Sequence, residues 1–92
     1  MSVLGLEGRE LELERKLIKL MAKKLVFESL VRKHFYIEAH RIMSEEEREE
    51  LSYLMLTLYQ KVAAKMTRTQ FRRTITAAAA RKLVEALGKL DC

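Results

Sequence analysis

The sequence predicts an all-α fold, a three-helix, bundle-like domain whose first helix is unusually long. Strong helix formers dominate the composition, because Leu, Ala, Glu, Lys and Arg are the most frequent residues. The chain has no Pro, no Trp and no Asn, and its three Gly lie near the ends. Few turn-forming residues remain, which argues against a β-rich fold. With 92 residues, the chain is long enough for one domain, 1–92, and too short for two.

The first predicted helix covers about 7–43. Apolar residues recur at helical spacing along one face, namely Leu13, Leu17, Leu20, Phe27 and Val31. Lys24 interrupts this face. A helix of this length would exceed most helices of globular proteins, so the alternative is a bend between Ser29 and Tyr36. We expect one continuous helix, too long for either following helix to cover alone. The protein is therefore expected to form a homo-oligomer or to dock as a subunit.

The second predicted helix covers about 45–66, and its start is the clearest boundary signal in the chain. Ser44 precedes Glu45, Glu46 and Glu47, which is the pattern of a capping box. In that motif the Ser hydroxyl accepts a hydrogen bond from the amide three residues on, while the Glu carboxylate accepts one from the Ser amide. The helix is therefore expected to begin at Glu45.

The third predicted helix covers about 68–90. Thr67 and Gln70 form a second capping box, and the low helix propensity of Thr also favours a break near residue 67. Beyond it, a wide apolar arc is expected to face the core, formed by Phe71, Ile75, Ala78, Ala79, Leu83, Ala86, Leu87 and Leu90. Gly88 is expected to mark fraying toward the end of this helix.

A run of positive charge between Lys61 and Lys82 is the most informative functional feature. It holds seven basic residues and no Asp or Glu. On one continuous helix, the first four of these cations would form a narrow stripe. The predicted break at Thr67 instead places them at a corner between two helices. Neighbouring cations repel one another, and a polyanion would turn that repulsion into binding energy.

We therefore expect a small basic protein that binds the phosphate backbone of RNA or DNA without strong sequence specificity, as an accessory subunit of a nucleoprotein complex. Its predicted contacts are Lys61, Lys65, Arg68, Arg72 and Arg73, with Arg81 and Lys82 at the periphery. A second basic strip on the first helix, Lys16, Lys19 and Lys23, would extend this surface if the helices align. The simplest alternative for all these cations is a solvated face that binds nothing.

Two other functions stay open. Amphipathic helices with several Met residues near their apolar stripes are also typical of a non-enzymatic scaffold or adaptor. Segment 51–84 has the outline of a helix-turn-helix transcription regulator, although Thr67 and Arg68 occupy the turn, where Gly is customary.

The chain shows no pattern typical of an enzyme or of a membrane protein. It has no glycine-rich phosphate loop, no Ser-His-Asp or Cys-His arrangement, and no metal-ligand spacing around His34 and His40. We expect no catalytic activity, cofactor, metal or small-molecule substrate. Cys92 is the single cysteine and has no intrachain partner, and no apolar run is long enough to span a membrane. A cytoplasmic location is expected, and the Glu/Lys/Arg-rich composition is typical of heat-adapted proteins.

Overall fold

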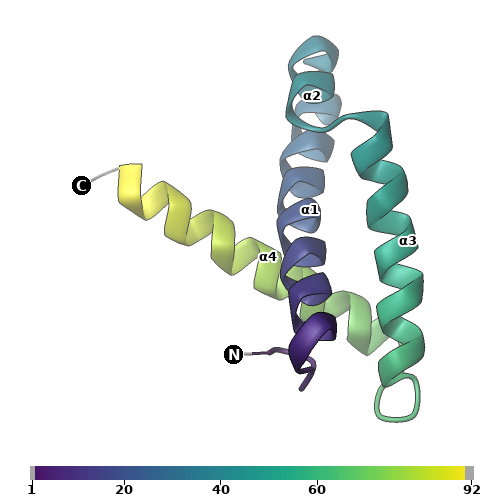
Figure 1. The fold of residues 1–92 in the computed structure, drawn as a ribbon. Coiled ribbons are helices and arrows are strands. Elements are labelled where there is room, and N and C mark those ends of the chain that lie inside the picture. The colour runs from purple at the N-terminus through teal and green to yellow at the C-terminus, as the bar shows by residue number, and fades with distance from the viewer. Residues whose placement is uncertain (1, 91–92) are drawn as a thin grey trace.

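The computed structural model describes residues 2–90, and that part of the chain is all-helical (Figure 1). Its helices are α1 (Gly8–Arg32), α2 (Tyr36–Ile42), α3 (Glu45–Val62) and α4 (Arg68–Leu90). The predicted fold class, all-α with a long first helix, is confirmed. Both capping boxes mark the helix starts expected from the sequence, at Glu45 and at Arg68.

The prediction of one continuous helix over 7–43 is wrong, because α1 ends at Arg32 and α2 begins at Tyr36. The chain leaves α1 through a Schellman motif: the amide of Phe35 donates to the Leu30 carbonyl at 2.8 Å and that of His34 to the Val31 carbonyl at 3.0 Å. His34 has a φ of 66°, in the left-handed region where Gly is usual at this position. The break falls inside the stretch that the sequence left open for a bend.

Residues 2–7 fold back against α1 and are held there by a buried carboxylate. Glu14 is 1% exposed. Its oxygens accept hydrogen bonds from the Ser2 hydroxyl at 2.6 Å, from the Leu4 amide at 3.0 Å and from the Val3 amide at 3.3 Å. Because hydrogen bonds compensate its burial, Glu14 fixes the N-terminal segment and brings Leu4 into the core.

The core is built around α1, which contacts α2, α3 and α4. α3 runs alongside α1, and α4 crosses α1 obliquely (Figure 1). The buried side chains follow helical spacing on each element. They include Leu17 and Leu20 of α1, Leu51, Leu54, Leu58 and Val62 of α3, and Phe71, Ile75 and Ala79 of α4. The apolar faces predicted for the first half of α1 and the first three turns of α4 are therefore the faces that pack.

The C-terminal half of α4 extends away from α1 (Figure 1). Ala79 is the last fully buried residue along it, and Val84 and Leu87 are 68% and 61% exposed. The predicted apolar arc therefore reaches the core only through about residue 83. Cys92 lies outside the described residues. Among residues 2–90, no helix combines the length and the hydropathy needed to cross a membrane.

Candidate nucleic-acid interface

The basic run from Lys61 to Lys82 bends at the turn between α3 and α4. α3 ends at Val62, and the second capping box starts α4: the Thr67 hydroxyl oxygen accepts from the Gln70 amide at 3.1 Å, and the Gln70 side-chain oxygen accepts from the Thr67 amide at 2.9 Å. The cations around this turn form what we call the basic corner, defined as Lys65, Arg68, Arg72 and Arg73. All four are exposed.

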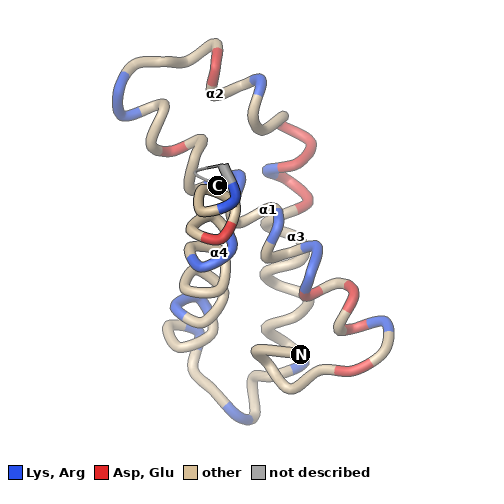
Figure 2. The backbone as a smooth tube through the Cα atoms, turned by 90° about the vertical axis from the view of Figure 1, so that its left-hand side faces the viewer, with Lys and Arg blue, Asp and Glu red and all other residues tan. Residues whose placement is uncertain are grey.

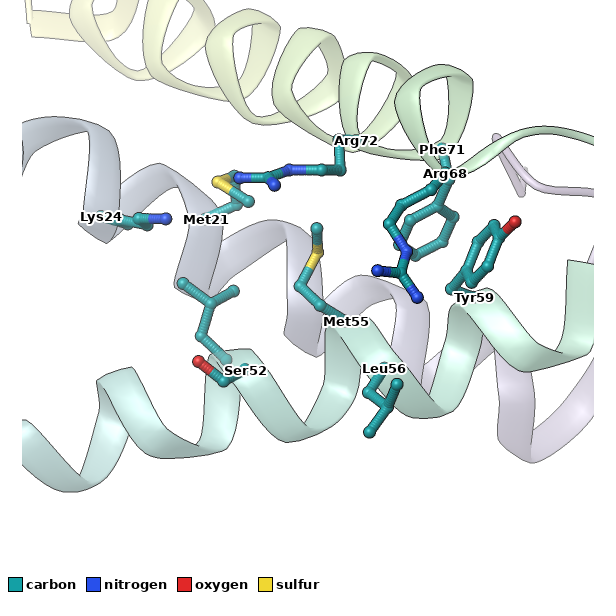
Figure 3. Close-up of a pocket in the computed structure, with 10 residues that line it drawn as sticks. Met21, Lys24, Ser52, Met55, Leu56, Tyr59, Arg68, Phe71 and Arg72 are labelled. Atoms are coloured by element: carbon teal, nitrogen blue, oxygen red, sulfur yellow. The ribbon is translucent and has the colours of Figure 1, made fainter. Parts of the chain in front are cut away.

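Within the basic corner, the cations point in different directions. Arg68 and Arg72 lie one turn apart on the side of α4 that faces α3 (Figure 3). The Arg68 guanidinium lies 5.5 Å from the centroid of the Tyr59 ring, which is a cation–π distance. Arg73 is one residue beyond Arg72 and so points about 100° away, toward solvent. The corner therefore presents charge over a wide angle instead of a single stripe.

Arg81 and Lys82 lie more than two turns farther along α4, on its exposed C-terminal half. Glu85 is the one acidic residue of α4, whereas acids are frequent in α1 and α3 (Figure 2). Neither Arg81 nor Lys82 forms an ion pair within residues 2–90. They extend the positive surface of α4 but are separated from the corner.

Three of the predicted contact residues are instead bound in ion pairs between α1 and α3. Lys16 pairs with Glu50, Lys23 pairs with Glu47, and Lys61 lies 3.8 Å from Glu10. These pairs are exposed and run along antiparallel helices, so they join α1 to α3 with a small stabilising effect. Lys19, from the same strip as Lys16 and Lys23, is exposed and has no ion pair within residues 2–90.

The Glu47 carboxylate is stabilised by two partners at the contact between α1 and α3. The ammonium group of Lys23, which donates a hydrogen bond to it, and the Ser44 amide of the capping box both lower the pKa of the Glu47 carboxyl below its ordinary value of 4.5. A carboxylate with two such partners is favoured in its charged form. The charge of Lys23 is thus neutralised by Glu47, so Lys23 is less able to bind an anionic ligand than the neighbouring Lys24.

A groove of about 290 Å³ opens between α3 and α4, with α1 at its base (Figure 3). We call it the α3–α4 groove. Its lining is apolar on the inside and cationic at the edges, and it contains no acidic residue: Met21, Lys24, Leu51, Ser52, Met55, Leu56, Tyr59, Arg68, Phe71 and Arg72. The groove exists because α3 and α4 each pack on α1 and diverge from the turn that joins them (Figure 1).

Sequence reasoning missed Lys24 and the groove beside it. Lys24 interrupts the apolar face of α1. That interruption could have indicated that part of this face is not covered by another helix. Met21 and Met55 are among the Met residues near the apolar stripes, and both line the groove. Nothing in the spacing of the sequence gives the divergence of α3 and α4, which decides whether a groove forms.

The other clusters of polar side chains have local roles. The His34 ring nitrogen and the Tyr36 hydroxyl are 2.9 Å apart, and the ring of His40 packs edge-on against Phe27 at 5.5 Å. Within residues 2–90, no three His, Cys, Asp or Glu side chains lie together as a metal site would require. No protein-family model matches the chain, and no curated protein or solved structure is significantly similar to it.

Proposed function

We propose that this protein binds the phosphate backbone of a nucleic acid through the basic corner, without chemistry and without strong sequence specificity, as a small subunit of a nucleoprotein assembly. One observation carries the proposal: Lys65, Arg68, Arg72 and Arg73 are exposed and form no ion pair within residues 2–90. Lys16, Lys23 and Lys61 are matched by acids, and the corner differs from the other unpaired cations because no acidic residue occurs between Lys61 and Lys82.

The physical basis is electrostatic. Four cations close together repel one another, and phosphates that replace solvent counterions remove that repulsion and release the counterions. The corner also offers polar donors beside its cations, because Thr67 and Thr69 lie at the exposed start of α4. Hydroxyl groups and the first amides of a helix both donate to phosphate oxygens. Contacts of this kind hold the backbone and do not distinguish bases.

Backbone contact and recognition of one duplex sequence predict different specificities. A helix-turn-helix regulator would instead prefer its own site over random DNA by about 10³-fold or more. Selection from a pool of random duplexes separates the two functions, because only a regulator would enrich one sequence.

Reversing two charges of the corner tests the proposal. We expect the Arg68→Glu/Arg72→Glu variant to bind single-stranded RNA, single-stranded DNA and duplex DNA more weakly than wild type, with a similar loss for every sequence. Fluorescence anisotropy across a salt titration measures this loss. Acids near a helix N-terminus complement the helix dipole, so the substitution at Arg68, the first residue of α4, is compatible with that helix. Circular dichroism would verify the fold of the double variant.

The matched control is Lys33→Glu/Arg41→Glu, which changes the net charge equally. Both residues are exposed. Lys33 follows the end of α1 and Arg41 is in the last turn of α2, and α2 lies at the end of the molecule away from the α3–α4 turn (Figure 1). The control variant should keep most of the affinity. If both double variants lose affinity alike, only the net charge matters and the corner is no site.

A second candidate function, an oligomeric scaffold, is favoured by the exposed apolar side chains on the C-terminal half of α4. Val84 and Leu87 are 68% and 61% exposed on a segment that leaves the core, and exposed apolar surface of this kind is typical of protein contacts. A scaffold would form a stable oligomer that Val84→Ser/Leu87→Ser disrupts, and it would show no salt-dependent affinity for nucleic acid. Sedimentation velocity together with the anisotropy assay distinguishes it from the first proposal.

A further inference from the structure

We propose that the α3–α4 groove receives an unstacked base, so that the nucleic acid bound at the basic corner is single-stranded. This inference rests on the proposed function, since the corner supplies the phosphate contacts and the groove would supply a contact to the base between them. It adds a ligand class, a flexible strand with splayed bases, that backbone binding alone does not specify.

The interior of the groove suits a flat, weakly polar ring. Met21 of α1 and Met55 of α3 present their thioethers to the groove, and Leu51 and Leu56 of α3 complete the apolar wall (Figure 3). Thioether side chains adapt to the shape of a ligand and make favourable contacts with aromatic rings. With a volume of about 290 Å³, the groove is just below the range of small-molecule pockets, about 300–1,000 Å³. It therefore has room for a ring system and not for a partner helix.

One end of the groove is aromatic. The Tyr59 ring meets the buried Phe71 ring edge-on, with centroids 5.5 Å apart and an interplanar angle of 60°. The Arg68 guanidinium lies 5.5 Å from the centroid of the same Tyr59 ring. Aromatic rings and guanidinium planes are the surfaces on which proteins stack single-stranded bases. Here the Tyr59 ring lies against both the Phe71 ring and the Arg68 guanidinium.

The charges around the groove complement a base flanked by phosphates. Arg68 and Arg72 project from α4, and Lys24 projects from α1 near the other end of the cavity (Figure 3). No acidic side chain lines the groove, and Lys24 forms no ion pair within residues 2–90. A strand with one base inserted would thus place phosphates beside cations on both sides of that base.

A duplex does not fit this arrangement. Its bases are stacked and paired, so inserting one would require unstacking that costs free energy before any contact forms. A single strand needs no such step, and stacking on an aromatic platform tolerates any base. We therefore expect the protein to prefer single strands over duplexes and to show no preference for sequence. Contact with phosphates alone would not produce the preference for single strands.

The test fills the groove without changing its charge. Ser52 lines the groove from α3, whereas Tyr53, the next residue, is 67% exposed and is not part of the lining. We expect wild type to bind oligothymidylate about tenfold or more tightly than an abasic strand of the same length, because each stacked base contributes about that factor. Ser52→Trp should abolish this difference while the salt slope stays as in wild type. Tyr53→Trp should leave the difference intact.

Leu56→Trp, a second filling variant from the same wall, should repeat the Ser52→Trp result and guards against one variant failing to fold. If wild type binds the abasic strand and oligothymidylate equally, with normal salt dependence, the groove inference is wrong while backbone binding at the corner stands. If no strand binds at all, both proposals fail. If Ser52→Trp keeps the base preference and changes only the sedimentation of the protein, the groove is a protein contact and the inference is overturned.

Discussion

Lys23 and Lys24 are neighbours in sequence but meet different surroundings. Successive residues of an α-helix point about 100° apart. Lys23 therefore reaches Glu47 of α3, whereas Lys24 lines the α3–α4 groove. The first lysine stabilises the pairing of two helices, and the second adds an unpaired charge to the lining of the groove. The chemical role of each cation is thus decided by the helix that its side chain faces.

The Lys23–Glu47 pair predicts a pH dependence of stability. Since the pKa of Glu47 is lower in the folded protein than its ordinary 4.5, the pair contributes stability that is fully present above that value and is lost as pH falls through the lowered pKa. Glu47→Gln keeps a capping-box side chain but removes the charge. We expect it to be less stable than wild type at neutral pH and to approach wild type as the pH falls well below 4.5.

Urea unfolding of both proteins at several pH values measures this convergence. Glu49→Gln is the matched control, because Glu49 is exposed on the same helix and forms no ion pair within residues 2–90. Its free energy of unfolding should stay near that of wild type throughout. A stability gap for Glu47→Gln that does not change with pH would contradict the assignment.

At the scale of the helices, boundaries follow from caps. Ser44 and Thr67 each begin a helix through a reciprocal pair of hydrogen bonds with the residue three positions on. His34 ends α1 in the left-handed conformation with a φ of 66°. For a residue with a side chain, that conformation costs about 1–2 kcal/mol, and the hydrogen bonds of the Schellman motif offset it.

The strain at His34 leads to a prediction. His34→Gly should raise the free energy of unfolding by up to about 1 kcal/mol, because Gly adopts a positive φ without steric cost while also losing more entropy on folding. The contact between His34 and Tyr36 is lost in this variant, which limits the gain. Thermal and urea unfolding measure the change.

Lys33→Gly is the control, because Lys33 has a φ of −92° and gains nothing from the freedom of Gly. It should lower stability by about 0.5–1 kcal/mol. If His34→Gly destabilises the protein as much as the control does, the conformation at residue 34 carries no strain and the account of the break is wrong.

The helix starts could be predicted from the sequence, because a capping box is a local signal written within four residues. The end of α1 could not, since the usual signal is Gly or Asn and the chain places His34 there instead. The predicted apolar arc of α4 packs on the core through Leu83, which is partly buried. Beyond it Leu87 is exposed, because burial depends on whether a neighbouring helix is present, and α1 no longer lies beside that half of α4.

At the scale of the whole molecule, α1 organises the fold. α2, α3 and α4 each pack on it, and the ion pairs of Lys16, Lys23 and Lys61 with Glu50, Glu47 and Glu10 join α1 to α3. The positive charge that remains in the net charge of +5 is most concentrated on α4 (Figure 2). The basic corner results from this distribution of charge. The groove results from the divergence of α3 and α4, which no sequence pattern predicts.

Self-association stays a prediction at this scale. The two apolar ends of the molecule lie apart, one at Tyr36 and Ile37 of α2 and one at Val84 and Leu87 of α4, and all four side chains are at least half exposed. Either end would bury apolar surface against a second chain. Neither end overlaps the basic corner, so nucleic-acid binding and self-association are separable by substitution.

The central claim is that phosphates bind at Arg68 and Arg72, and the salt dependence of affinity tests it most directly. The logarithm of the binding constant for a single strand should fall linearly with the logarithm of the salt concentration, with a slope of about −0.7 for each phosphate neutralised. Arg68→Gln/Arg72→Gln removes two such contacts, so its line should be less steep than that of wild type by about 1.4. Parallel lines for the two proteins would contradict the account.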